Sequence, residues 1–250
     1  MTAAAVMLSP PAAEVTQELV EAALTAFGQP AAARYAEIDA LARFGHEPVD
    51  EPARRWAERI ATADAFPLFG TGLSASTYPA LLWNGARLDA IVPDVHWAPL
   101  LAALAAADPA DVSGLERVAR ALAAAETVRQ GAAGLLSADA LPVAWPTLST
   151  MAAATAAHLG SGCGGDGLAR VLDLAVSLTA LTPGETRSAA SGLWAGHGAA
   201  SGWLAARLPS EAVTPMAGSV AHTLSAAAGH RADSERKHGV SVADVLTRLR

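Results

Sequence analysis

Three polar side chains suited to acid–base chemistry fall within eight residues of one another. Asp89, Asp94 and His96 lie between two alanine-rich segments of high helical propensity. Carboxylates and imidazoles placed where buried helices break have pKa values shifted by burial and by one another, which suits them to proton transfer. A solvated loop whose aspartates cap the next helix has the same spacing. The stretch is therefore a candidate catalytic site, and a plain loop is the alternative.

The elements that position this stretch are predicted to be helices. Apolar residues recur at helical spacing and the runs end at glycine, proline or polar turns, over residues 14–27, 30–44, 52–63, 98–107, 147–159 and 168–181. Ser113 with Glu116 forms a capping box, and Thr182 followed by Pro183 is a strong helix start. No alternation typical of a strand reaches a useful length, so the fold class is all-α.

The helix predicted to start at Thr182 is rich in glycine. Gly192, Gly196, Gly198 and Gly202 lie among alanines, although glycine costs a helix interior about 1 kcal/mol relative to alanine. Such a concentration indicates either close backbone approach to neighbouring helices or a gap that receives a ligand.

Composition limits the remaining choices. The 250 residues are 52% apolar but only 5% aromatic, with a formal charge of −7 and no long charged run. This balance argues against nucleic acid or an anionic membrane as partner. Cys163 is the only cysteine, and the histidines lack company at ligand spacing, so we expect no metal and no cofactor. Residues 1–12 are expected to be a flexible tail without a secretory signal, and residues 13–250 a single helical domain of a cytoplasmic protein.

Several motifs follow one another in an order that carries a resemblance. They are Gly70-Thr71-Gly72, Pro79-Ala80, Asn84-Gly85, Ala123-Ala124-Ala125-Glu126, Trp145-Pro146, and Thr186-Arg187 before the glycine-rich helix. Over residues 12–208 the chain resembles the helical domain of the MmgE/PrpD family, which includes 2-methylcitrate dehydratases and cis-aconitate decarboxylases. The resemblance implies an all-α domain that forms a homodimer.

The departures from that family suggest changed chemistry. Asp89 takes the place of a family histidine, Val92 that of the aspartate usually given a catalytic role, and Trp145 that of a second histidine. Arg187 replaces a lysine. We expect no counterpart of the family's second α+β domain, and residues 209–250 are expected to form divergent helices. These replacements favour an uncharged, hydrophobic substrate with one or two polar anchors.

We therefore expect a cyclase or double-bond isomerase of secondary metabolism, acting without a cofactor on a largely apolar small molecule. The expected catalytic groups are Asp89, Asp94, His96 and Arg187, and the expected substrate-binding residues are Asn84, Trp97, Trp145, Trp194 and His197. A core role for His197 stays open. One alternative is a dehydratase or decarboxylase of a small carboxylic acid, with Arg187 binding the carboxylate. The other is a helical ligand-binding or partner protein without catalysis.

Overall fold

The computed structural model describes residues 10–30, 35–63, 66–92, 96–108, 111, 113–138, 140–179, 191–208 and 213–236. Within these residues the chain is mostly helical, with one two-stranded sheet. The elements are α1 (Pro10–Phe27), α2 (Tyr35–Phe44), α3 (Glu51–Ile60), β1 (Phe66–Leu68), β2 (Leu73–Ala75), α4 (Thr77–Ile91), α5 (Trp97–Ala106), α6 (Gly114–Gly134), α7 (Leu141–Gly160), α8 (Leu168–Ser177), α9 (Ser191–Arg207) and α10 (Ser219–Arg236). The prediction of an all-α class is confirmed at this level, apart from the two short strands.

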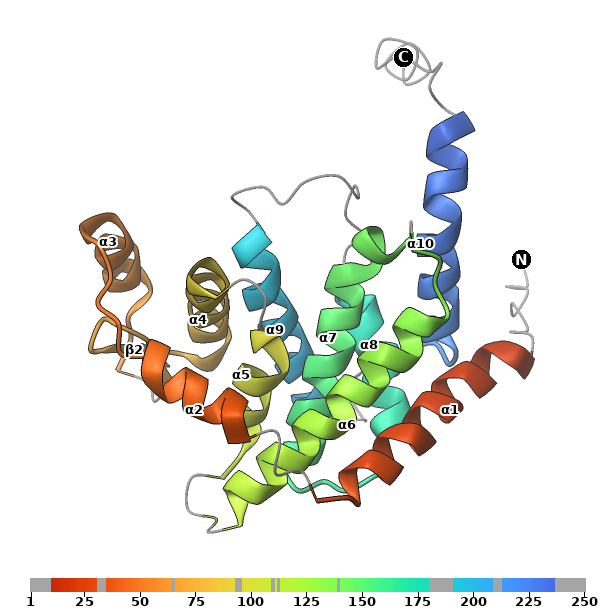
Figure 1. The fold of residues 1–250 in the computed structure, drawn as a ribbon, viewed down its shortest axis with the longest axis horizontal. Coiled ribbons are helices and arrows are strands. Elements are labelled where there is room, and N and C mark those ends of the chain that lie inside the picture. Colours follow the sequence, from red (N-terminus) through yellow and green to blue (C-terminus); the bar gives the residue numbers. More distant parts are fainter. Residues whose placement is uncertain are drawn as a thin grey trace.

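Helix α7 is the centre of the molecule, with α5, α6, α8 and α9 packed against it (Figure 1). Every residue from Pro146 to Gly160 is buried. Most of these residues are alanine, serine or threonine, and small side chains let neighbouring helices approach closely. The larger Leu148, Met151 and Leu159 fill a core shared with α1, α6, α8 and α10. The alanine-rich composition thus produces a helix surrounded on all sides.

Helices α4 and α9 cross at a pair of buried glycines. A Cβ added to Gly85 would lie 2.3 Å from the Cα of Gly196, and one added to Gly196 would lie 2.2 Å from the carbonyl oxygen of Leu82. Because these neighbours are backbone atoms, neither position has room for a side chain. At this crossing the glycines serve close backbone approach, which was one of the two explanations for the glycine-rich helix.

The two strands form an antiparallel hairpin in which Phe66 lies opposite Ala75. Asn84 on α4 holds this hairpin: its Oδ1 accepts a hydrogen bond from the Phe69 N–H at 2.9 Å, and its Nδ2 donates to the Pro67 carbonyl at 2.9 Å. The expectation that no strand would form was wrong here. Strands of three residues are too short to produce a recognisable alternation, and a side chain from a distant helix stabilises them.

A buried carboxylate joins α10 to the rest of the molecule. Asp173 on α8 accepts hydrogen bonds from the backbone N–H groups of Gly218 and Val220, at 3.0 and 3.1 Å. The Thr16 hydroxyl on α1 donates to the same carboxylate at 3.3 Å. The first N–H groups of a helix have no partner within it, and a negative charge there also complements the helix dipole. Asp173 therefore fixes the start of α10 against α1 and α8.

Two helices begin earlier than predicted because proline was read as a breaker. Helix α1 begins at Pro10, within the segment predicted to be a tail, of which residues 1–9 lie outside the described part. Helix α7 begins at Leu141, with Pro142 in its first turn and Pro146 inside it. Proline in a first turn removes only an N–H that lacks a helical partner anyway. The predicted helix start at Thr182 lies outside the described residues.

Asp89 was expected to lie at a break between helices, but α4 runs through the polar segment 84–89 to Ile91. Its polar appearance has another cause: Asn84 bonds to the hairpin and Gly85 packs on α9. The break between helices is confined to residues 92–96, of which 93–95 lie outside the described part. Trp56 on α3 is exposed, and the centroid of its ring lies 4.9 Å from that of the Trp83 ring.

Two long stretches of the sequence carry no Asp, Glu, Lys or Arg: residues 141–165, which contain α7, and residues 188–206, which contain most of α9. None of the helices in the described residues combines the length and apolarity that crossing a bilayer requires.

Candidate functional site

The residue before α5, the C-terminal half of α6 and the start of α7 meet at a group of polar and aromatic side chains. The ring centroid of His96 lies 4.6 Å from that of Trp145, with the ring planes tilted by 55°. The guanidinium carbon of Arg129 lies over the same indole, 5.7 Å from its centroid. We call these three residues, with Glu126 and Gln130 of α6, the His96 site.

The acidic and basic members of the His96 site bind one another. Arg129 donates from Nε to Glu126 Oε2 at 2.8 Å and from Nη2 to Glu126 Oε1, which is a bidentate arrangement. Gln130 adds a hydrogen bond from Nε2 to Glu126 Oε1 at 2.6 Å. The side chains of Arg129 and Glu126 are only 18% and 20% exposed. The pair therefore has weaker solvent screening than a surface ion pair.

The surroundings of His96 keep its imidazole neutral near pH 7. Burial is the largest cause and lowers the pKa of His96 below its ordinary value of 6.5; the positive charge of Arg129 lowers it further, and the negative charge of Glu126 opposes both. Burial raises the pKa of Glu126, but the hydrogen bonds from Arg129 and Gln130 outweigh it, so that pKa lies below 4.5. The site thus places a neutral base beside a fully ionised acid–guanidinium pair.

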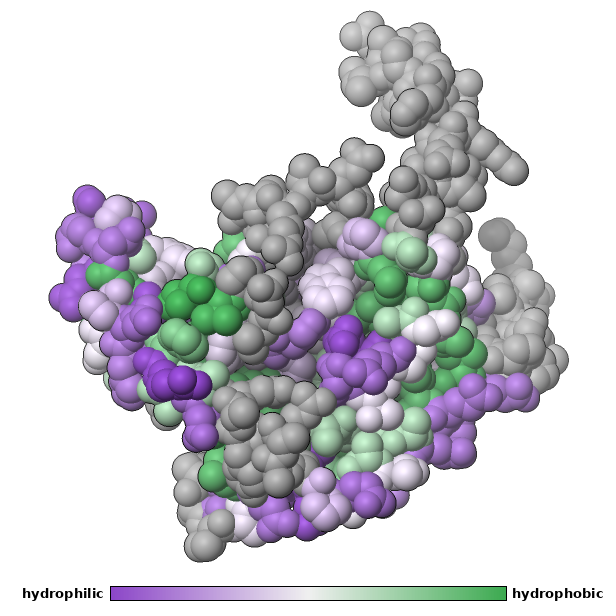
Figure 2. Space-filling view, in the orientation of Figure 1, coloured by the Kyte–Doolittle hydropathy of each residue, from purple (hydrophilic) through white to green (hydrophobic). Residues whose placement is uncertain are grey.

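The aromatic member of the site is accessible. Trp145, which was predicted to bind substrate, is 42% exposed. In Figure 2, hydrophilic surface lies over the C-terminal half of α6, with hydrophobic surface beside it. An accessible indole next to a neutral imidazole and a neutralised guanidinium can bind the apolar part of a ligand while the imidazole exchanges a proton with it.

The structure brings together only some of the residues predicted for the site. His96 and Trp145 are in contact. Asp94 and Arg187 lie outside the described residues. Asp89 lies near the end of α4 and is partly buried.

Two predicted substrate-binding residues have structural roles instead. Both polar groups of the buried Asn84 side chain are bonded to the hairpin backbone. Trp97 is fully buried, and its Nε1 donates to the Val92 carbonyl at 3.1 Å, which closes the turn between α4 and α5. Neither offers a group to a ligand, because burial and internal hydrogen bonds already use the surface that a ligand needs.

Trp194 and His197 form a second cluster on α9. Their rings meet edge to face with centroids 6.1 Å apart. His197 Nε2 lies 3.2 Å from the Leu178 carbonyl, at the end of α8, and 3.4 Å from the Ser201 hydroxyl. These contacts fit the core role that was left open for His197, since they tie α9 to the end of α8.

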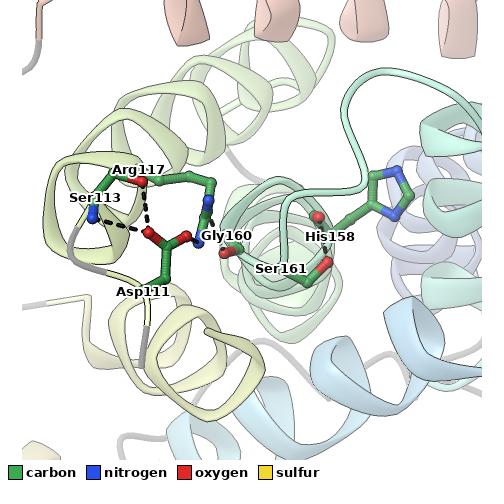
Figure 3. Close-up of polar contacts among 6 residues, drawn as sticks. All are labelled: Asp111, Ser113, Arg117, His158, Gly160 and Ser161. Atoms are coloured by element: carbon green, nitrogen blue, oxygen red, sulfur yellow. Dashed lines mark hydrogen bonds and ion pairs between the residues drawn. The ribbon is translucent and has the colours of Figure 1, made fainter. Parts of the chain in front are cut away.

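The opposite end of the α6–α7 pair carries another arginine, acid and histidine, which sequence reasoning did not single out (Figure 3). Arg117 donates from Nε to the Gly160 carbonyl at 3.0 Å and forms an ion pair with Asp111. Hydrogen bonds from Ser113 and Arg117 lower the pKa of Asp111 to about 2. His158, in the last turn of α7, is buried and its Nε2 bonds to the Asp166 carbonyl at 2.9 Å.

Arg129 was not named from the sequence, and Glu126 was named only as part of a motif and not as a site residue. The available signal was their spacing. Opposite charges three residues apart, with a glutamine four residues after the acid, lie on one face of a helix and bind one another. Their contact with Trp145 depends on how α6 packs against α7, so spacing alone does not reveal it.

Among the residues that the structure describes, no three His, Cys, Asp or Glu side chains converge as metal ligands. Cys163 is exposed, and its sulfur accepts a hydrogen bond from the Ser161 hydroxyl at 3.1 Å. The His96 site contains one histidine and one acid, and that acid is bound to arginine. Its chemistry is therefore that of proton transfer and of binding through an aromatic ring.

Comparison of the chain with known proteins gives no significant match to a protein family, to a curated protein or to a solved structure. The arrangement of the side chains is thus what carries a functional argument.

Proposed function

We propose that this protein is a cofactor-independent enzyme that moves a proton within a largely apolar small molecule, as a double-bond isomerase or a cyclase. One observation carries the proposal: the imidazole of His96 is partly buried and neutral, and it packs against the accessible ring of Trp145. A neutral imidazole near pH 7 is a competent base. The indole provides a flat apolar surface that suits an unsaturated substrate.

In an isomerisation, His96 removes a proton from the carbon between a double bond and a carbonyl group, and the electron pair moves toward the carbonyl oxygen. The resulting imidazolium returns the proton to the far end of the former double bond, so no atom is gained or lost. Asp89, Asp94 and Arg187 are proposed to assist in polarising the substrate or shuttling the proton.

The relationship to the MmgE/PrpD helical domain is part of the same proposal and rests on the order of the sequence motifs. The close crossing of α4 and α9 supports the proposal because it gives Asn84-Gly85 and the glycine-rich helix, two of the motifs, a common structural purpose. A homodimer and a cytoplasmic location are proposed on this relationship alone.

The test is incorporation of deuterium from heavy water into linear and cyclic β,γ-unsaturated ketones, followed by NMR. We expect His96→Gln to lower the exchange rate by about 10²–10⁴-fold, the usual contribution of a general base. His158→Gln is the matched control and retains the rate. Equal rates for the wild type and His96→Gln would refute the proposal.

A ligand-binding protein without catalysis is the second candidate, and the 42% exposure of Trp145 favours it. An accessible indole binds apolar molecules whether or not a base acts on them. Quenching of Trp145 fluorescence by the ketones without any deuterium incorporation would establish this candidate. A dehydratase or decarboxylase stays a third proposal, because its carboxylate-binding group, Arg187, lies outside the described residues.

A further inference from the structure

The guanidinium of Arg129 is already occupied within the protein. Two of its nitrogens bind the two oxygens of Glu126, and Gln130 binds Glu126 from the next turn of α6. This fork-to-fork geometry is the one in which arginine otherwise recognises a substrate carboxylate. Glu126 thus takes the place that such a carboxylate would fill.

This occupied pair also lies where a ligand would bind. Arg129 contacts the same indole that His96 contacts, with 5.7 Å from the guanidinium carbon to the ring centroid and 4.6 Å between the His96 and Trp145 rings. A carboxylate that binds beside Trp145 would be repelled by the negative charge of Glu126, and Arg129 would not be free to bind it. Since both side chains are about four-fifths buried, that repulsion is weakly screened. An uncharged molecule meets no such penalty.

We infer that Glu126 is a specificity-determining residue that excludes carboxylates from the His96 site by binding Arg129, so that the site takes uncharged unsaturated molecules. The inference rests on the proposed function in naming His96 and Trp145 as the site. It separates the two enzymatic candidates, because an apolar substrate and a carboxylic acid place opposite demands on Arg129. Replacement of Glu126 by glutamine keeps an oxygen for Arg129 but removes the competing charge.

The test uses two probes with the same chain, trans-2-hexen-1-ol and trans-2-hexenoate. Binding is followed by the NMR signals of the His96 ring, assigned with His96→Gln. We expect the wild type to bind the alcohol about tenfold more tightly than the carboxylate. We expect Glu126→Gln to bind the carboxylate about tenfold more tightly than the wild type does, since a hydrogen bond to a charged group contributes about 1.5–3 kcal/mol. The double variant Glu126→Gln/Arg129→Gln is the matched control and loses the gain.

Two results would overturn the inference: a wild type that prefers the carboxylate, or a Glu126→Gln variant whose preference between the probes is unchanged. If Glu126→Gln does not fold, hexenoate binding to the wild type is measured at several salt concentrations instead. Because Glu126 neutralises Arg129, we expect that lowering the salt concentration does not strengthen this binding. A strengthening would contradict the inference.

The inference is refuted by the ratio of the affinities for the two probes. The proposed function is refuted by an unchanged deuterium exchange rate in His96→Gln. The two failures are therefore distinguishable. If the NMR signals of His96 respond to neither probe in any variant, the inference and the proposed function are both contradicted.

Discussion

The two ends of the α6–α7 pair carry similar side chains in different surroundings. At the end shown in Figure 3, Arg117 binds Asp111 and His158 lies nearby on α7; at the other end, Arg129 binds Glu126 and His96 packs on Trp145. Arg117 and His158 both bond to backbone carbonyls, those of Gly160 and Asp166. Arg129 and His96 instead contact the ring of Trp145.

This difference separates structural groups from candidate functional ones. A carbonyl at the end of a helix lacks a partner within the helix, so a side chain that binds it stabilises the fold. A side chain that packs on an accessible ring leaves its polar atoms for other partners. Residue type alone therefore does not identify a site, because an arginine, an acid and a histidine occur at both ends.

The largest difference in stability between the two ends should appear when each ion pair is removed as a whole. Replacement of Arg117 by methionine together with Asp111→Asn leaves the Gly160 carbonyl without its donor, and we expect a loss of about 2 kcal/mol in the free energy of unfolding from that hydrogen bond alone. Replacement of Arg129 by methionine together with Glu126→Gln removes two groups that satisfied one another, which is often nearly neutral. Urea unfolding of the two double variants measures the difference.

The single variant Arg117→Lys is the control for charge, since lysine keeps the charge but not the fork of donors. Equal losses in both double variants would contradict the comparison, because they would mean that the two pairs contribute to stability in the same way.

A smaller effect concerns the two histidines and the pH dependence of stability. Burial lowers the pKa of both His96 and His158 below 6.5. The unfolded chain therefore binds more protons than the native one as pH falls below 6.5, so stability decreases until the lowered native pKa is reached and then levels off. We expect His96→Gln and His158→Gln each to remove part of this decrease, as measured by thermal unfolding from pH 7.5 downward in steps of about half a unit.

The two variants should differ at neutral pH. Loss of the hydrogen bond to Asp166 is expected to lower the stability of His158→Gln by about 1 kcal/mol, whereas His96→Gln changes it less. Acid sensitivity that survives in both variants would show that other groups are responsible.

The sequence predicted those parts of the fold that depend on local pattern. Leu168, Val171 and Leu172 recur at helical spacing and are buried as expected on α8. The glycines of α9 also indicated close packing. The hairpin and the full length of α4 were missed because Asn84, which looks like a loop residue, is satisfied by a segment fifteen positions earlier in the chain.

Only part of the candidate site was predicted from the sequence. His96 and Trp145 were both named, but for separate roles, and their contact depends on α7 beginning at Leu141, which Pro142 and Pro146 concealed. Arg129 was not recognised as part of the site. Only the packing of α6 against α7 shows that its charge lies over an indole.

The smallest effect is expected at Asp111 in acid. Hydrogen bonds from the Ser113 hydroxyl, from Arg117 and from the Ser113 backbone lower the pKa of this carboxyl from 3.8 to about 2. Since the native pKa lies below the unfolded one, the carboxylate stabilises the fold above pH 3.8, and this contribution is lost as pH falls through about 2. The stability difference between the wild type and Asp111→Asn should therefore shrink across this window, and salt should reduce it at pH 7 because the pair is accessible to solvent. Urea unfolding at several pH values in high and low salt measures both trends. A stability difference that stays constant down to pH 2 would contradict this prediction. It would show that the hydrogen bonds that Ser113 donates to Asp111, rather than the charge of the carboxylate, stabilise the start of α6.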